Sequence, residues 1–381
     1  MRAPLPLAPL DDAQRLACLR LALSENVGPV AFRELINLFG GAAPALEALP
    51  RLAGRGGKRS VRVCPRDRAE AQLQAARRVG AEIVFTIEPG YPMALASLEV
   101  PPPMLYLKGR KELLSRPAIA IVGSRNCSAA GHSLARQWSE ALGRAGLIVV
   151  SGLARGIDAA AHAAALSTGT VAVLAGGVDV AYPPENADLQ ARIAEEGCLI
   201  AELPPGYAPR GQDFPRRNRI ISGVARAVVI VEAARRSGSL ITARLANEQG
   251  RQVYAAPGHP LDPRAEGTNQ LIKSGATLVT SAHDILSDLR PSIGLSDEPD
   301  GHEVPSGRRH MADRAPSPEP FPDDDAREKV VAALGPAPVG IDELARATGL
   351  AARDLQIVLL ELSLAGRIDR QGGGLVSLRA A

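Results

Sequence analysis

Hydrophobic residues recur at three- and four-residue spacing in the first part of the chain. The pattern runs through residues 11–23, 30–40 and 45–54, and no alternating strand pattern interrupts it. This spacing places the apolar side chains of a helix on one face. We therefore predict a small all-helical domain over residues 1–78.

A short turn, Asn26-Val27-Gly28-Pro29, separates the first two predicted helices. In a helix-hairpin-helix unit, a glycine turn of this kind offers backbone N–H groups to a phosphate. Any helical hairpin also needs such a turn for packing alone. The domain is expected to be SAM-like or helix-hairpin-helix-like, and contact between this turn and DNA stays open at this point.

The periodicity changes near residue 80. Short, uniformly apolar runs follow one another, with helical intervals between most of them: AEIVFTI, AIAIVG, LIVVSG, VAVLAGG, CLIAEL, AVVIVEA, QVYAAPG and ATLVT. Such runs are typical of strands buried on both faces, and their alternation with helices is typical of a parallel sheet. We predict an α/β domain over residues 79–290, with an extended Rossmann-like, doubly wound parallel sheet.

The last part of the chain changes character again. Residues 291–322 contain seven prolines among Ser, Asp and Gly, a composition that predicts a disordered linker. Residues 323–381 then show three helical patterns and a hairpin pattern, the order of a winged helix. Its third helix carries one Arg against Asp354 and Glu361. A helix that reads duplex DNA should be basic, so this domain is expected to pack or to bind a partner.

Composition limits the classes of function. The 381 residues include 44 Lys+Arg and 41 Asp+Glu, a formal net charge of +3, so a polyanion site must come from local clustering. The four cysteines show neither zinc-site nor disulfide spacing, and we expect no metal or cofactor. No apolar run approaches the ~18 residues of a membrane span, and the N-terminal segment lacks a signal peptide's apolar region. We expect a cytoplasmic protein without membrane association.

Small and polar residues follow four of the predicted strands, at Gly123-Ser124-Arg125, Ser151 to Gly156, Gly176-Gly177 and Ser237-Gly238-Ser239. In an open parallel sheet, the ligand crevice lies at the carboxyl ends of the strands, and such turns lead into helix N-termini that favour anions. None of the turns matches a dinucleotide fingerprint or a P-loop. A single turn can reflect tight geometry alone, but four along one edge predict a phosphate-binding edge.

A basic cluster, Phe214-Pro215-Arg216-Arg217-Asn218-Arg219, precedes an apolar helical run. Guanidinium groups bind phosphates in a forked geometry, an Asn can read a base edge or a sugar hydroxyl, and an aromatic ring can stack on an unpaired base. The alternative is a solvated charge run. Aromatic residues make up 3% of the chain, so we expect backbone gripping with little sequence preference. Arg217→Ala should then remove most single-strand binding with the fold intact.

Two further cations follow the cluster. Arg244 lies just beyond Ser237-Gly238, and Lys273 lies in the run Asn-Gln-Leu-Ile-Lys-Ser-Gly. Lys273 is equally well explained as an ordinary surface lysine.

Candidates for catalysis are few. Four histidines show neither metal-ligand spacing nor a neighbouring nucleophile: His132, His162, His259 and His283. Asp179 and Glu232 lie close to strand ends, where a carboxylate can act as a general base. The chain is not expected to be an enzyme, although these two carboxylates keep a nucleotide-cleaving activity open.

Several strings of the central region together resemble the DNA-processing protein A (DprA, also called Smf) family of natural transformation. They are Gly-Ser-Arg at 123–125, SGLARGIDAAAH at 151–162, GGVDVAYPPEN at 176–186, FPRRNRIISG at 214–223, SGSLITA at 237–243 and APGHP at 256–260. The resemblance implies a homodimer, formed through the Rossmann-like domain, that binds single-stranded DNA and loads the recombinase RecA onto it. Together, the resemblance and the basic cluster select these DNA-binding positions: Arg125, Gly206, Phe214, Arg216, Arg217, Asn218, Arg219, Ser237, Gly238, Arg244 and Lys273.

Two other readings compete with this one. A nucleotide phosphoribohydrolase of the lysine-decarboxylase-like group has a similar sheet, but that group uses a Pro-Gly-Gly-x-Gly-Thr turn where this chain has Arg-Ser-Gly-Ser-Leu-Ile-Thr-Ala. A transcription regulator would rest on the winged helix alone, whose acidic third helix argues against it.

Overall fold

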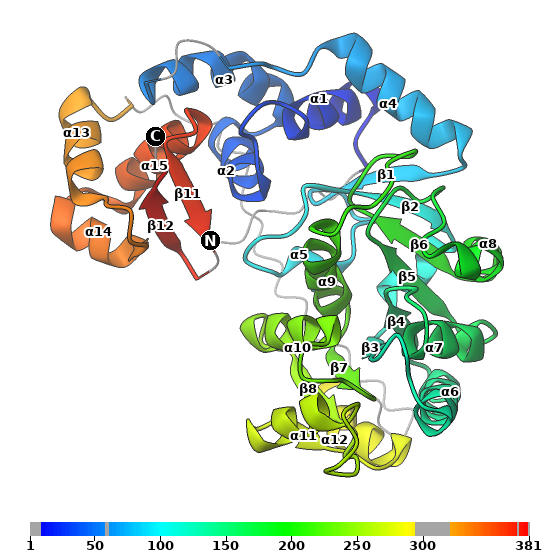
Figure 1. Cartoon of the computed structure of the whole chain (residues 1–381). Coiled ribbons are helices and arrows are strands. Elements are labelled where there is room, and N and C mark those ends of the chain that lie inside the picture. Colours follow the sequence, from blue (N-terminus) through cyan, green and yellow to red (C-terminus); the bar gives the residue numbers. More distant parts are fainter. Residues whose placement is uncertain (1–8, 58–60, 294–320, 372, 380–381) are drawn as a thin grey trace.

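In the computed structural model, a helical N-terminal domain and a C-terminal winged helix lie side by side at one end of a central α/β domain (Figure 1). The structure describes residues 9–57, 61–293, 321–371 and 373–379. The arrangement confirms the predicted fold class.

The N-terminal domain consists of helices α1 (Asp12–Ala22), α2 (Pro29–Phe39), α3 (Ala42–Arg55) and α4 (Arg66–Arg78). Asp11 and Gln14 form a reciprocal capping box at the start of α1, which satisfies backbone N–H groups left free there. Gly40 ends α2 in the left-handed conformation, with φ 72°. Helix α4 was not predicted as a separate helix because its sequence is mostly polar and it buries only two alanines among its helical residues.

The central sheet contains strands β1 (Glu82–Phe85), β2 (Met104–Gly109), β3 (Ala118–Val122), β4 (Ile148–Ser151), β5 (Thr170–Leu174), β6 (Cys198–Ala201), β7 (Ala227–Ile230), β8 (Gln252–Ala255) and β9 (Thr277–Leu278). The strand order is β1-β2-β6-β5-β4-β3-β7-β8-β9. Neighbouring strands are parallel throughout the part of the sheet that runs β6-β5-β4-β3-β7-β8-β9, as predicted.

The β1 end of the sheet differs from the prediction. Strand β1 pairs antiparallel with β2, and β2 pairs antiparallel with β6, so the run AEIVFTI has an antiparallel neighbour instead of the expected parallel one. Helices cover both faces of these strands: Phe85 and Tyr106 pack toward the N-terminal domain, while Val84 and Leu105 pack into the core on the opposite face. An antiparallel strand buried on both faces has the same uniformly apolar sequence as a parallel one.

Helices cover both faces of the sheet, as a doubly wound fold requires. One face packs against α6 (Ala129–Arg144), α7 (Ile157–Ala165), α8 (Ala187–Glu196) and α12 (Ala282–Ile293). The other face packs against α5 (Met93–Ala96), α9 (Asp213–Val224), α10 (Gly238–Glu248) and α11 (Glu266–Lys273). Short 3-10 turns lie at η1 (Lys111–Ser115) and η2 (Pro184–Asn186).

The winged helix comprises α13 (Asp324–Ala333), α14 (Ile341–Thr348), α15 (Ala352–Leu364) and strands β10 (Val339–Gly340), β11 (Ile368–Gln371) and β12 (Leu375–Leu378). Helix α15 packs on α2 and α3 of the N-terminal domain, and Leu360 and Leu364 join that domain's core. Glu361 of α15 is fully buried and pairs with Arg55 (2.5 Å) and Arg327 (3.1 Å). These contacts support the packing role predicted for the third helix.

The elements at the limits of the central domain are α4 and β1 at one end and α12 at the other. Helix α4 ends at Arg78 and β1 begins at Glu82, whereas α12 continues to Ile293, past the expected limit at 290. Most of the predicted linker, residues 294–320, lies outside the described residues. Helix α13 begins after Asp323, whose carboxylate accepts a hydrogen bond from the Ala326 N–H.

Candidate nucleic-acid interface

The strand order creates a switch point at β3. The chain passes from β3 through β4 and β5 to β6 on one side, and from β7 through β8 to β9 on the other. Ligands of open α/β sheets bind at the carboxyl ends of strands beside such a point. The four predicted turns follow β3, β4, β5 and β7, which are adjacent strands, and therefore lie along one edge.

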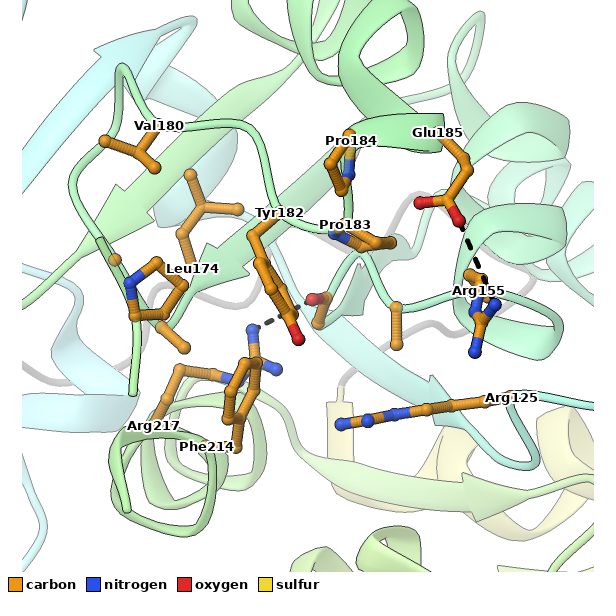
Figure 2. A pocket seen from close by; sticks show the side chains of 15 residues that line it. Arg125, Arg155, Leu174, Val180, Tyr182, Pro183, Pro184, Glu185, Phe214 and Arg217 are labelled. Atoms are coloured by element: carbon orange, nitrogen blue, oxygen red, sulfur yellow. Dashed lines mark hydrogen bonds and ion pairs between the residues drawn. The ribbon is translucent and has the colours of Figure 1, made fainter. Parts of the chain in front are cut away.

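A pocket of about 260 Å³ opens at this edge. It lies between the turns after β3, β4 and β5 and the start of α9, and we call it the strand-end pocket. Its wall includes Arg125, Arg155, Tyr182, Glu185, Phe214 and Arg217 (Figure 2). The volume approaches the lower end of the range of about 300–1,000 Å³ that is usual for ligand sites.

Two aromatic rings and an arginine meet in the pocket. The Phe214 and Tyr182 ring centroids lie 5.2 Å apart with the planes tilted by 48°. The Arg125 guanidinium carbon lies 5.4 Å from the Phe214 centroid, and Figure 2 shows this side chain pointing toward the ring. An aromatic face and a guanidinium side by side can hold a planar base and a phosphate at once.

Arg217 lies beneath the pocket with 7% of its surface exposed. Its guanidinium donates to the backbone carbonyls of Gly152 (2.9 Å) and Val173. Asp158 lies near the same turn and accepts hydrogen bonds from the N–H groups of Gly152 (3.1 Å) and Ala154 (3.4 Å). Arg217 thus holds a carbonyl group of the turn after β4, and Asp158 holds two of its N–H groups. Removing Arg217 would alter this turn, so the expectation that Arg217→Ala leaves the fold intact needs correction.

Burial perturbs the ionisable groups of this region. Burial lowers the pKa of Arg217 to about 10, opposed by the nearby Asp158 carboxylate, so the guanidinium stays charged at neutral pH. Burial raises the pKa of Asp158, while the Arg217 charge and the N–H groups of the turn oppose that shift. Burial lowers the pKa of His162 to about 3, assisted by the Arg217 charge.

His162 is expected to make the protein sensitive to acid. Because its pKa is about 3 in the folded state against 6.5 ordinarily, the unfolded chain takes up a proton first as the pH falls. Above pH 6.5, both the folded and the unfolded chain hold a neutral His162, and the free energy of unfolding does not depend on its protonation. Between pH 6.5 and about 3, the free energy of unfolding falls by about 1.4 kcal/mol per pH unit. Urea unfolding near pH 7, 6 and 5 should show the stability of wild type falling relative to His162→Gln; parallel pH profiles for the two proteins would contradict this.

Three predicted residues lie next to the pocket without lining it. Asn218 is buried, and its side-chain amide donates to the carbonyl of Gly238 (3.3 Å). Ser237 caps α10, and its hydroxyl lies 2.7 Å from that of Ser239. The Asn218 contact therefore ties α9 to the start of α10 at the strand-end edge.

Gly206 occupies a loop beyond the pocket wall. Its φ is 79°, in the left-handed region that favours glycine. Its N–H donates to the Asp179 carboxylate (2.8 Å to Oδ1). That N–H is therefore already engaged by a carboxylate.

The remaining cations point elsewhere. Arg216 is exposed and pairs with Glu202 (3.2 Å), and Lys273 is exposed in the last turn of α11. Neither lines a cavity that we identify in the described part of the chain. Arg219 and Arg244 line a second, larger cavity on the other side of α9.

Sequence reasoning missed Tyr182 and Arg155. Tyr182 lies in the GGVDVAYPPEN string after β5, and Arg155 lies in the turn after β4. Both occur in segments already expected at the strand-end edge. The scarcity of aromatic residues could have drawn attention to Tyr182.

The carboxylates proposed as general bases are engaged. Glu232 accepts hydrogen bonds from the Ser128 N–H (2.9 Å) and hydroxyl (2.5 Å), and Asp179 binds the Gly206 N–H. The pocket carboxylate, Glu185, lies 3.8 Å from the Arg155 guanidinium.

Two findings concern ligands and membranes within the described residues. No cluster of three or more His, Cys, Asp or Glu side chains is placed to hold a metal ion there. The helices of the described chain are all too short or too polar to cross a bilayer.

Fold and site together define a class of three-domain protein. A Rossmann-like core with a cationic strand-end pocket follows an N-terminal helical domain, and a winged helix docks on that helical domain. Family models match each part, as "DNA recombination-mediator protein A" over 82–290, "DprA-like N-terminal HHH domain" over 12–75 and "DprA winged helix domain" over 314–374. The chain belongs to the DNA recombination-mediator protein A (DprA) family.

Individual relatives agree with this assignment. Protein Smf of Escherichia coli is 38% identical over 320 residues, 83% of each chain. The X-ray structure of DNA processing protein A from Streptococcus pneumoniae matches with a TM-score of 0.60 and 33% identity, over 74% of this chain and 99% of that one. A structure of DNA processing protein A from Helicobacter pylori, described for its unique single-stranded DNA binding mode, matches with a TM-score of 0.50 and 29% identity, over 53% and 94% of the chains.

Proposed function

We propose that this protein binds single-stranded DNA through the strand-end pocket, largely without sequence preference. The observation that carries the proposal is the group of Arg125, Phe214 and Tyr182 at one mouth, where a base can stack while a cation meets its phosphate. A duplex keeps its bases stacked and paired, and so offers no free base to this pocket. The Helicobacter pylori relative, described for single-stranded DNA binding, supports the same ligand class.

We further propose that the bound strand is handed to the recombinase RecA in the cytosol by a homodimer formed through the central domain. The family's description as a recombination mediator supports the hand-over. Strand β9 lies at the end of the sheet, and its Leu278 is half exposed, which supports association through the central domain. Measuring the mass in solution tests the dimer, and RecA filament formation on strands coated with single-strand-binding protein tests the hand-over.

The role is proposed to be non-enzymatic. Glu185 faces Arg155, Asp158 is buried under the turn after β4, and Asp179 and Glu232 are hydrogen-bonded elsewhere. None of these carboxylates is placed as a free general base at the pocket. Release of a free base from a nucleoside monophosphate by the purified protein would instead favour the phosphoribohydrolase alternative.

Salt dependence provides the direct test of binding through phosphates. About four neutralised phosphates predict that log affinity for a single strand falls with log salt at a slope near −3, since each phosphate contributes about −0.7. Titration of labelled oligonucleotides at several salt concentrations measures this slope. A slope near zero, or tighter binding to a duplex than to a single strand, would contradict the proposal.

A further inference from the structure

A large cavity lies between the three domains, on the opposite side of α9 from the strand-end pocket. Its volume is about 1100 Å³, and we call it the interdomain cavity. Residues from the start of α2, the loop after α5, helices α9 and α10, and the winged helix contribute to its wall. Five arginines line it: Arg219, Arg244, Arg251, Arg370 and Arg379.

The acidic residues of the wall already have donors. Glu99 accepts hydrogen bonds from the N–H groups of Gly373 and Gly374 in the wing, at 3.0 Å each. Glu248 pairs with Arg244 (2.7 Å), and Asp369 pairs with Arg379 (2.9 Å).

Cations outnumber anions in this wall. Five arginines stand against three acids among the lining residues. Two of the arginines also reach acids outside the wall, Arg219 to Glu202 and Arg370 to Glu34. Arg244 and Arg379 are exposed despite their ion pairs, so their guanidinium groups remain accessible to an anionic ligand.

Arg370 has donors without acceptors. Its side chain is 10% exposed, and its Nη1 donates to the Glu34 carboxylate (2.7 Å). Its Nε and Nη2 are buried and have no hydrogen-bond partner among the described residues. On its ion-pair partner, Glu34 Oε2 is likewise buried without a hydrogen bond, so Arg370 contributes a buried positive charge to the wall rather than donors that a ligand can reach.

The first turn of α2 adds donors from the opposite wall. Helix α2 begins after Gly28, which offers no side-chain cap, and has Pro29 at its first position. Gly28, Val30 and Ala31 line the cavity, and a Cβ placed on Gly28 would meet no atom within 4 Å. Open space before an uncapped helix N-terminus favours an anion there.

The positions of the interdomain cavity and the strand-end pocket allow one DNA strand to pass from one to the other. Arg217 and Arg219 are two residues apart on α9, so their side chains diverge by about 200° and serve opposite sides of the helix. Helix α10 begins with Gly238 at the strand-end edge, and Arg244 follows about 9 Å along its axis. A single DNA strand that leaves the strand-end pocket over the start of α10 would therefore reach the interdomain cavity.

We propose that the interdomain cavity binds a second stretch of the single-stranded DNA backbone, so that the N-terminal domain and the winged helix both contribute phosphate contacts. The inference rests on the proposed function, because it concerns the same strand. A duplex groove is disfavoured because α15, the helix that would enter it, is packed against α2 and α3 with Glu361 fully buried.

The test uses the full chain with the double variant Arg244→Gln/Arg379→Gln. Both side chains are exposed, at 66% and 56%, so the fold should persist. Oligothymidylates of about 5 and about 16 nucleotides distinguish one site from the whole path. For the longer strand, the salt slope should become shallower by about 1.4, twice the 0.7 expected per phosphate, while the slope for the shorter strand should not change.

Arg192→Gln is the matched control, because Arg192 also pairs with an acid four residues on, Glu196, at comparable exposure on α8. An unchanged long-strand slope in the double variant, with normal short-strand binding, would overturn the cavity assignment alone. Failure of the wild type to bind either strand would overturn the proposed function and the cavity assignment together. Loss of duplex affinity without loss of single-strand affinity would also overturn the assignment, in favour of a duplex site.

Discussion

Arg217→Ala is expected to lower the free energy of unfolding by about 2–6 kcal/mol, because two buried carbonyl acceptors lose their donor at about 1–3 kcal/mol each. The substitution leaves Asp158 buried beneath the strand-end pocket without its cation. It also removes the donors that hold the carbonyls of Gly152 and Val173. Single-strand binding should fall as well, because these contacts set the shape of the pocket floor.

Urea unfolding followed by tryptophan fluorescence measures this loss. Trp138 is the single tryptophan of the sequence and is buried in α6 of the central domain, so its emission reports on the domain concerned. Arg216→Ala is the neighbouring control: Arg216 is exposed and its ion pair should contribute no more than about 1 kcal/mol. If Arg217→Ala and Arg216→Ala unfolded at the same urea concentration, the structural role of Arg217 would be wrong.

Arg217→Lys separates charge from geometry. Lysine keeps the positive charge near Asp158 but cannot reproduce the planar fork that reaches two carbonyls. Its stability should therefore lie between those of wild type and Arg217→Ala. A lysine variant as unstable as the alanine variant would show that the fork, rather than the charge, supports the turn.

Much of the central sheet could be predicted because its strands are short and buried on both faces, which leaves runs such as AIAIV and AVVI unmistakable. Strand β2 was missed because Pro101, Pro102 and Pro103 precede it and Lys108-Gly109 end it. These residues resemble a loop in sequence, although the intervening side chains are buried.

The site was predicted less completely, because a linear cluster does not show which way its members face. Arg216, Arg217 and Arg219 are close in sequence, but a helix turns by about 100° per residue. One of them is exposed, one is buried beneath the pocket, and one reaches the interdomain cavity. Tyr182 and Phe214 come together only through folding, because they follow different strands of the sheet.

Phe214→Ala should weaken binding to single-stranded DNA by about 1–3 kcal/mol, or roughly 5- to 150-fold in Kd, the range for one lost base stack. The side chain presents its ring beside Tyr182 and beneath the Arg125 guanidinium, so its removal takes away the stacking face and the surface that orients the cation. Phe214→Trp should retain most affinity because it keeps a planar face, whereas Phe214→Leu should lose most of it.

Phe321→Ala provides the control for these Phe214 variants. Phe321 also lies under guanidinium groups, those of Arg51 and Arg55 at 5.2 and 5.3 Å, but it packs against the N-terminal domain away from the strand-end edge. Its removal should leave single-strand affinity unchanged while Phe214→Ala lowers it at every salt concentration, because stacking depends on the ring rather than on charge. Equal affinity of Phe214→Ala and wild type, measured by fluorescence anisotropy, would place the bound base outside the strand-end pocket.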